Sequence, residues 1–258
     1  MADNQYAFPT EELSLPSGGK LYPEDSPLNK GTIDVKYMTA KEEDILTSTN
    51  LIEKGTVIDK VLESVIADSK VKLDDLLIGD KNALMLGTRV LGYGKDYTVT
   101  ITDPDTSLEV EHTFDLTKLK TKKLDKKLFE SGKNEFEFTL PNSKRAITFK
   151  LLTHRDEREI DSAVEATAKL TQITGISNEL TTRLKQQIVS VDGNNDRKFV
   201  NDFVDNQFLA MDSKAFRNHY EDITPDVIFE ADYTSQLGEP HKVDIPVGVR
   251  FFWPDARV

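Results

Sequence analysis

Residues 15–44 read LPSGGKLYPEDSPLNKGTIDVKYMTAKEED, and this stretch decides the fold that we expect. A segment rich in proline and glycine leads into a β-branched run at residues 32–38, which favours a strand. The run stops at Thr39, whose hydroxyl is suited to cap a helix, and Glu42 is placed to accept a hydrogen bond from the amide of Thr39. The stretch therefore predicts an extended arm, a strand and a capped helix, in that order.

The first 30 residues are predicted to form an extended arm, because they hold four of the ten prolines and show little periodicity. Disorder is the alternative for such a composition. Glycines, prolines, a leucine and a tyrosine on an exposed segment would suit docking onto a partner. The predicted partner-binding residues of the arm are Leu15, Pro16, Gly18, Gly19, Lys20, Leu21, Tyr22 and Pro23. On this hypothesis, deleting residues 1–23 abolishes partner binding and spares folding.

The composition excludes several classes of function. The 258 residues are 38% hydrophobic, enough to bury the core of one large domain or two modest ones. Cysteine is absent, which excludes disulfides and thiolate metal sites, and four histidines leave little for a zinc site. A net charge of −12 repels the phosphates of nucleic acids. Neither a signal peptide nor an apolar run near the ~20 residues that span a bilayer is present, so we expect a soluble protein made in the cytoplasm.

The chain predicts an α+β fold, because helical and strand periodicities occupy different segments. We expect a short helix at residues 40–49, a second helix from Thr56, and a third from Asp80, as its cap, to Gly92 or Gly94. The second and third helices are predicted to bury Val57, Val61, Leu62, Val65, Leu84, Met85, Val90 and Leu91. Such apolar stripes indicate a core rather than a binding site.

Three β-hairpins are predicted from alternating apolar and polar residues. Their turns lie at residues 103–107, 141–145 and 238–240. Six lysines lie between the first two hairpins, at residues 118–127. This run is either a solvated helix face, which we favour, or a basic binding patch on an acidic protein.

Residues 153–222 are predicted to be wholly helical. Thr153 and Asp156 are typical of a capping box, and Ser177 is the expected cap of a later helix that ends at Asp192. We expect this block to be a helical subdomain inserted into an α+β domain of residues 31–152 and 223–258, which follows the arm of residues 1–30.

Short motifs of catalysis and metal binding fail in detail. Asp192, Asn194 and Asp196 open like a calcium loop, but Arg197 stands where that loop needs glycine. Residues 154–156 read HRD, as in a kinase catalytic loop, but neither the following asparagine nor an Asp-Phe-Gly is present. The glycine-lysine pairs lack the spacing of a P-loop. We therefore predict no catalytic residue, no metal ligand and no cofactor.

Four segments together resemble a known family. They read LPSGGKLYP at residues 15–23, IDVKYMTAKEEDIL at 33–46 with LIEKGTVIDKVLES at 51–64, DDLLIGDKNALML at 74–86 with RVLGYGKDY at 89–97, and VDIPVGVRFFWPDAR at 243–257. This set resembles the baseplate hub protein and hub assembly chaperone family of T-even-type contractile-tailed bacteriophages. The resemblance implies a non-enzymatic protein of the virion tail baseplate, made in the host bacterial cytoplasm. It also implies other baseplate or hub proteins as partners in a multi-subunit complex.

Some members of this family resemble zinc-ribbon proteins, with Cys-Pro-x-Cys-Gly knuckles at the tips of two hairpins. Here the first tip reads Asp103-Pro104-Asp105-Thr106-Ser107, without a thiolate. We therefore expect a metal-free remnant of a ribbon, in which apolar burial, at ~25 cal/mol per Å², replaces the metal. The residues expected to supply this burial are Ile101, Val110, Val227, Phe229 and Val243.

The densest aromatic cluster is Phe251, Phe252 and Trp253, and we add it to the predicted partner-binding residues because aromatic anchors dominate interfaces. The alternative is that the cluster is core, since alternation along a strand turns at least one of the three inward.

The expected function is that of a structural or assembly protein of a baseplate hub, acting through protein contacts. A tail-associated cell-wall hydrolase is an alternative, and a peptidoglycan clearing assay separates the two. A transient assembly chaperone, absent from the mature virion, is the alternative within the same class.

Overall fold

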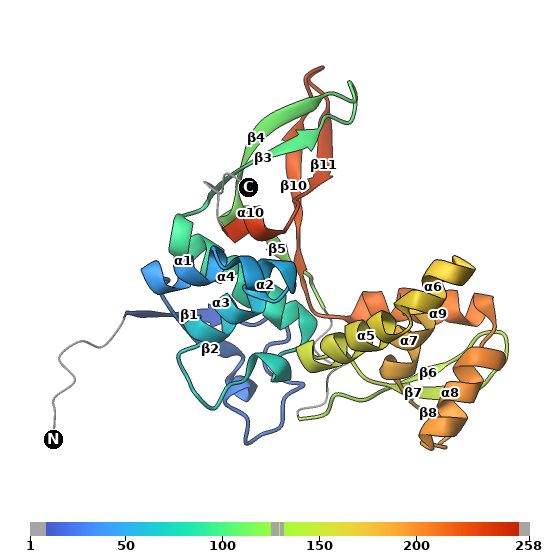
Figure 1. The fold of residues 1–258 in the computed structure, drawn as a ribbon. Coiled ribbons are helices and arrows are strands. Elements are labelled where there is room, and N and C mark those ends of the chain that lie inside the picture. The colour runs from blue at the N-terminus through green and yellow to red at the C-terminus, as the bar shows by residue number, and fades with distance from the viewer. Residues whose placement is uncertain (1–8, 125–128, 130–131, 253–258) are drawn as a thin grey trace, which may run out of the picture.

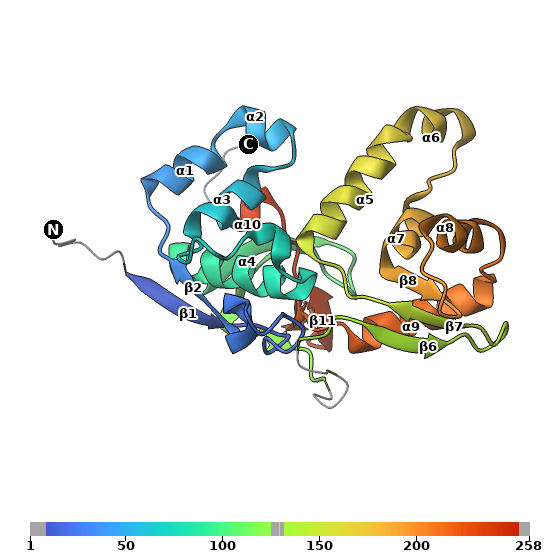
Figure 2. The ribbon, with the colours of Figure 1, turned by 90° about the horizontal axis from the view of Figure 1, so that it is seen from below.

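The computed structural model describes residues 9–124, 129 and 132–252, and it confirms the predicted α+β class. In Figure 1 the blue N-terminal helices and strands form one group, and a green and a red hairpin project from it side by side. The yellow and orange helices form a second group beside a three-stranded sheet, and Figure 2 shows the two groups from below.

The N-terminal group confirms the strand and the capped helix expected from residues 32–44. Its elements are β1 (Thr10–Ser14), β2 (Thr32–Lys36), α1 (Ala40–Leu46), α2 (Thr49–Glu53), α3 (Val57–Val65) and α4 (Ile78–Tyr93). β1 and β2 pair antiparallel, with Leu13 opposite Ile33. The predicted capping box of Thr39 and Glu42 starts α1.

The helices of this group bury most of the predicted apolar residues but differ in their bounds. All four stripe residues of α3 are buried, as are Leu84 and Met85 of α4, whereas Val90 and Leu91 are only half-buried. Gly94 ends α4 as expected. The helix expected at residues 40–49 is instead two short helices, α1 and α2. Asp80 as the cap of α4 is wrong, because Leu77 occupies that position and Asp80 lies buried inside the first turn.

Two of the predicted hairpins form the projection of Figure 1. Its strands and those beneath it are β3 (Asp96–Thr102), β4 (Glu109–Asp115), β5 (Lys120–Thr121), β9 (Val227–Ile228), β10 (Glu230–Thr234) and β11 (Pro240–Asp244). β3 pairs with β4, β10 with β11 and β5 with β9, all antiparallel. A helix over residues 118–127 is therefore wrong at its start, where Lys120 and Thr121 form β5, and residues 125–128 lie outside the described residues.

The second group contains a strand that the sequence pattern did not indicate. Its elements are β6 (Phe136–Thr139), β7 (Ala146–Phe149), α5 (His154–Ala166), α6 (Ala168–Thr174), α7 (Glu179–Gln187), β8 (Ile188–Val191), α8 (Arg197–Asn206) and α9 (Ala210–Ile223). The hairpin of β6 and β7 and the capping box of Thr153 and Asp156 are confirmed. A wholly helical block is wrong, because β8 follows α7 directly and pairs with β7. The cap of α7 is Asn178 rather than Ser177. The division of the chain into domains stays a prediction.

An ionic cluster joins α3, α4 and α5. Lys81 donates a hydrogen bond to Asp59 at 2.8 Å, and Nε2 of His154 lies 3.1 Å from the other carboxylate oxygen of Asp59. Burial alone would raise the pKa of Asp59, but the contacts with His154 and Lys81 outweigh it and lower the pKa to about 2. The ionised carboxylate therefore stabilises the packing of the three helices.

Acid is expected to weaken this cluster. Because the pKa of Asp59 in the folded protein lies below the ordinary value of 3.8, its stabilisation is complete above that value and is lost as the pH falls toward 2. Asp59→Asn should lower the free energy of unfolding at neutral pH by about 2 kcal/mol and flatten its dependence between about pH 5 and pH 2, measured by urea denaturation. Asp222→Asn, at an exposed site, is the control. Equal acid dependence in the two variants would contradict this role for Asp59.

Candidate interaction surfaces

Residues 15–31 form a compact loop, which we call the 15–31 loop, rather than a free arm. The amide of Leu15 donates to the carbonyl of Gly31 at 2.9 Å, which closes the loop at its ends. Gly31 has a φ of +80°, and a Cβ on it would lie 2.7 Å from the carbonyl oxygen of Gly18. A Cβ on Gly19 would lie 2.4 Å from the carbonyl oxygen of Asn29. Two crossing segments therefore approach so closely that only glycine fits at these positions.

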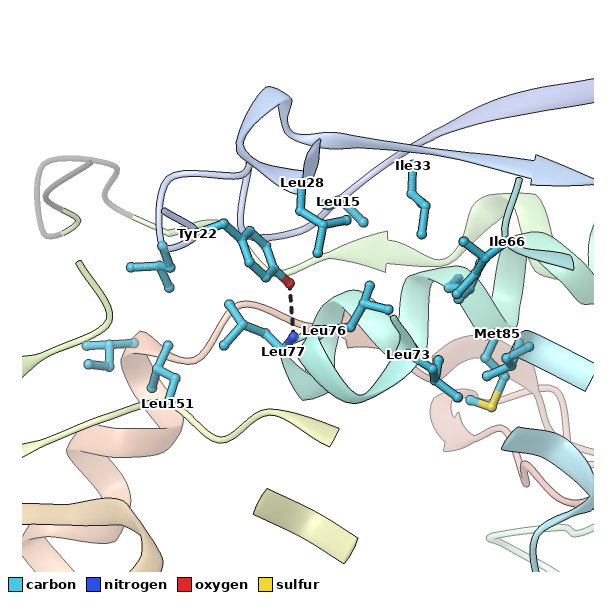
Figure 3. Close-up of a cluster of buried hydrophobic side chains, with 14 of the residues drawn as sticks. Leu15, Tyr22, Leu28, Ile33, Ile66, Leu73, Leu76, Leu77, Met85 and Leu151 are labelled. Carbon is cyan, nitrogen blue, oxygen red and sulfur yellow. Dashed lines mark hydrogen bonds between the residues drawn. The ribbon is translucent and has the colours of Figure 1, made fainter. Parts of the chain in front are cut away.

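Asp80 fastens the 15–31 loop to the start of α4. Its carboxylate accepts hydrogen bonds from the amide of Ser17 at 2.9 Å, the hydroxyl of Ser17 at 2.7 Å and the hydroxyl of Tyr22 at 2.6 Å. The Tyr22 oxygen accepts in turn from the amide of Leu77 at 2.9 Å, the bond drawn in Figure 3. The loop and α4 thus share one buried polar network.

Burial sets the protonation of this network. Burial raises the pKa of Asp80, while the hydrogen bonds from Ser17 and Tyr22 act in the opposite direction. Burial and the charge of Asp80 raise the pKa of Tyr22 well above its usual value. Tyr22 therefore remains a hydrogen-bond donor throughout the physiological pH range.

The structure places the largest predicted contact residues of the arm inside the molecule. Leu15, Leu21 and Tyr22 are buried, and Figure 3 shows Leu15 and Tyr22 on the side of the loop that faces Leu76 and Leu77. Gly19 is buried, Pro16 and Lys20 are half-buried, and Gly18 and Pro23 are exposed. The expected exposure is therefore wrong for these three large side chains. The hydrogen bonds to Asp80 and the apolar contacts with Leu76 and Leu77 keep this part of the loop inside the molecule.

This burial also changes the expectation for a truncated chain. Deleting residues 1–23 would remove three side chains of the core, so we no longer expect such a truncation to spare folding. Partner binding by residues 15–23 stays a prediction.

Phe251 and Phe252 lie in a one-turn helix, α10 (Val249–Phe252), and not in a strand. Both side chains are fully buried, and the ring of Phe251 packs edge-on against that of Tyr97 at a centroid distance of 5.1 Å. Their burial agrees with the core alternative, and Trp253 lies outside the described residues. A contact of this cluster with a partner stays a prediction.

The projecting hairpins offer a more accessible surface, and we call residues 96–115 together with 230–244 the hairpin head. Asp103, at the tip of the first hairpin, ties the two hairpins together. One of its carboxylate oxygens accepts hydrogen bonds from the hydroxyl of Tyr233 at 2.7 Å and the amide of Gln236 at 2.8 Å. The other oxygen accepts from the amides of Asp105 at 3.0 Å and Thr106 at 2.8 Å, within its own turn.

The bonds to Asp103 hold a charged carboxylate in a buried position. Burial opposes its ionisation, but the hydrogen bonds from Thr106, Tyr233 and Gln236 outweigh burial and hold the pKa of Asp103 below its usual range. A charged acceptor strengthens these bonds, which hold the two tips relative to each other.

Asp105 forms a second tie between the tips. Its carboxylate accepts a hydrogen bond from the hydroxyl of Ser235 and lies 3.0 Å from Nε2 of His241. Behind the tips, the ring of His112 packs edge-on against Tyr233 at a centroid distance of 5.1 Å. Polar side chains therefore join the two hairpins at the ends where a zinc ribbon has its knuckles.

The sequence indicated only part of this arrangement. Of the residues expected to supply apolar burial, Ile101 and Val227 are buried, and the others are half-buried: Val110, Phe229 and Val243. The polar residues that join the tips were not predicted. An aspartate followed by Pro-Asp-Thr is a recognisable turn signal, but nothing in it points to a tyrosine 130 residues further along the chain.

The outer end of the hairpin head carries two exposed leucines, and its flanks are acidic. Leu108 is 58% exposed and Leu237 is 70% exposed, each at the tip of its hairpin. The head holds ten acidic residues and one lysine, a net charge of −9 within a chain of −12. Glu109, Glu111 and Glu239 are exposed near the tips.

A groove beside the 15–31 loop is wide, but two of the cations that line it are already paired. Its volume is about 880 Å³ and Lys150 and Arg155 line it. Lys150 pairs with Asp156, and Arg155 pairs with Asp75. These ion pairs leave neither cation available to recognise an anionic ligand.

Two further observations concern sites of other kinds. Within the described ranges, no group of three or more histidine, aspartate and glutamate side chains is arranged to hold a metal ion. A search of the same part of the chain finds no helix with the length and apolar character to cross a membrane.

Comparisons with known proteins give one match. The family model described as T4 bacteriophage base plate protein matches residues 9–253. No curated protein and no solved structure matches the chain. The matched range includes the 15–31 loop, the hairpin head and the helices of the second group.

Proposed function

Because the chain belongs to the family of T4 bacteriophage base plate proteins, we propose that it is a non-enzymatic structural or assembly protein of the central hub of a phage tail baseplate. It acts there through contacts with other baseplate or hub proteins. On this proposal it is made and assembled in the host bacterial cytoplasm and functions in the virion tail.

The observation that carries this proposal is the extent of the family match, which runs from residue 9 to residue 253. The four sequence segments that resemble hub proteins and hub assembly chaperones support the hub in particular. The hairpin head supports action through protein contacts, because it combines a concentrated negative charge with two exposed leucines on turns that are bonded to each other.

Mass spectrometry of purified virions tests the proposal. We expect peptides of this chain in purified tails of the phage that encodes it, at a fixed copy number relative to the other tail proteins. Peptides found only in assembly intermediates from infected cells would identify a transient chaperone. Absence from both virions and intermediates would contradict a role in the baseplate.

A further inference from the structure

We propose that the hairpin head is a docking element for a partner protein that presents a basic surface with an apolar centre. This docking role rests on the proposed function, because it names the kind of partner that a baseplate protein would bind through the head. Three features of the head carry it: fixed tips, two exposed leucines and concentrated negative charge.

The tips are fixed before any partner arrives. Asp103 bonds to Tyr233 and Gln236 of the other hairpin, and Asp105 contacts Ser235 and His241 there. An isolated two-stranded hairpin is only marginally stable in water, whereas two hairpins bonded at their tips restrain each other. Binding to a restrained surface loses less conformational entropy than binding to a flexible one.

The leucines lie where a partner would meet the head first. Leu108 and Leu237 belong to different hairpins, but both stand beside the tied turns, and both are more than half exposed. An acidic residue follows each leucine, Glu109 directly after Leu108 and Glu239 two residues after Leu237. An apolar centre with a charged rim is the usual composition of a protein interface.

The charge of the head identifies the partner as basic. A charge of −9 on the 35 residues of the head leaves only −3 on the other 223 residues. Several acids elsewhere are paired, such as Asp74 with Arg158 and Asp34 with Lys30. By contrast, Glu109, Glu111 and Glu239 form no side-chain bond or ion pair with the described residues. Their charges are therefore available to an incoming lysine or arginine.

The same charge argues against a second copy of this chain as the occupant. Two heads of −9 each would repel on approach, and charges of one sign placed opposite each other disfavour a complex. This repulsion excludes a head-to-head pair, and the occupant that we assign is a different protein, recognised by its positive charge.

Binding to incomplete baseplates tests this assignment. The probe is the tail particles isolated from cells infected with a phage that lacks the gene for this chain, and the full-length chain is titrated onto them in co-sedimentation assays.

The acidic variant combines Glu109→Gln, Glu111→Gln and Glu239→Gln. Its matched control combines Asp161→Asn, Glu165→Gln and Asp222→Asn, three exposed acids outside the head. The apolar variant is Leu237→Ser. Its matched control is Met211→Ser, outside the head, because Leu237 and Met211 are almost equally exposed, at 70% and 71%. Thermal melts check that all variants fold.

We expect the acidic variant and Leu237→Ser each to bind at least about tenfold more weakly than the unaltered chain at about 50 mM salt. Both controls should remain within about twofold of it. Binding of the unaltered chain should weaken as salt rises, and the acidic variant should lose most of this dependence. A carbodiimide, which joins carboxylates directly to lysines, should link the head to lysines of another tail protein.

Three results would overturn the docking role while leaving the proposed function intact. These are unchanged binding of the acidic variant, equal losses in a head variant and its control, and carbodiimide links that join the head only to a second copy of this chain. If the unaltered chain does not bind the particles at all, the proposed function fails and the docking role fails with it.

Discussion

Replacing Asp80 by Ala is expected to lower the free energy of unfolding by about 4 kcal/mol, because the change leaves three buried donors without their acceptor. The hydroxyl and amide of Ser17 and the hydroxyl of Tyr22 all donate to this carboxylate, which is fully buried. Each buried donor left unpaired is worth about 1–3 kcal/mol, so even the lower bound of the sum exceeds the effect of an ordinary surface substitution. Urea denaturation at neutral pH measures the loss.

A local measurement distinguishes release of the loop from general unfolding. In Asp80→Ala, trypsin should cut after Lys20 and Lys30 in conditions where the unaltered chain is resistant, because the 15–31 loop has lost its attachment to α4. Tyr22→Phe, which removes one donor only, should lose less stability, about 1–2 kcal/mol. Asp161→Ala, at an exposed helix site, should change stability by less than about 0.5 kcal/mol. A loss below about 1 kcal/mol in Asp80→Ala would show that the network does not hold the loop.

Gly79→Ala is expected to destabilise the protein by about 3 kcal/mol or to prevent folding. A Cβ on Gly79 would lie 1.8 Å from the carbonyl oxygen of Pro225 and 2.7 Å from its carbonyl carbon, so backbone must move. Helix propensity alone predicts the opposite sign, a gain of about 1 kcal/mol for alanine within α4. The measured change in the free energy of unfolding therefore separates the two effects. A loss of stability shows that the close approach of residues 225–226 to α4 dominates, and a gain shows that helix propensity dominates.

Gly248→Ala is the matched control for this substitution, because nothing lies within 4 Å of a Cβ at Gly248. It should be within about 0.5 kcal/mol of the unaltered chain in the same thermal and urea melts. If Gly79→Ala is soluble and as stable as Gly248→Ala, the close approach of Pro225 to α4 does not constrain the fold. If Gly79→Ala is insoluble and Gly248→Ala is soluble, the result supports the view that the close approach of Pro225 to α4 constrains the fold.

Features with local causes were predictable from the sequence. The capping boxes at Thr39 and Thr153 each involve residues three apart, and both are present. The three hairpins follow from alternation around a turn, which is equally local. The apolar stripe of α3 required only the helical period. In each case the interacting residues are neighbours in the chain, so the pattern and the cause coincide.

Features with distant partners were not predictable in the same way. Asp80 has the residue type of a helix cap, but its partners Ser17 and Tyr22 are 63 and 58 residues away. The helical spacing of apolar residues in α7 continues into β8, so the sequence pattern there indicates a helix. Residues 188–191 form a strand because they pair with β7. Phe251 and Phe252 were expected in a strand, yet both are buried in a helical turn, where the ring of Phe251 contacts Tyr97.

The candidate surface shows the same division. The composition of residues 15–23 predicts exposure, but hydrogen bonds to the distant carboxylate of Asp80 hold the segment against α4, where Leu15, Leu21 and Tyr22 are buried. The hairpin head was predicted as two hairpins, whereas the bonds that join them cross 130 residues or more between Asp103 and Tyr233 or Gln236. Surface composition alone therefore predicted the wrong exposure for Leu15, Leu21 and Tyr22, because exposure depends on contacts that sequence spacing does not encode.

The two halves of the hairpin head leave the ribosome far apart in time. The first hairpin is complete at Asp115, whereas Tyr233 and His241 are made only near the C-terminal end of the matched range. Until then, Asp103 has its own turn as a partner but lacks the second hairpin, and the long intervening chain makes the pairing slow. A nascent or prematurely terminated chain therefore has no finished head. If docking requires the head, incorporation into the particle is restricted to chains translated at least as far as Asp244.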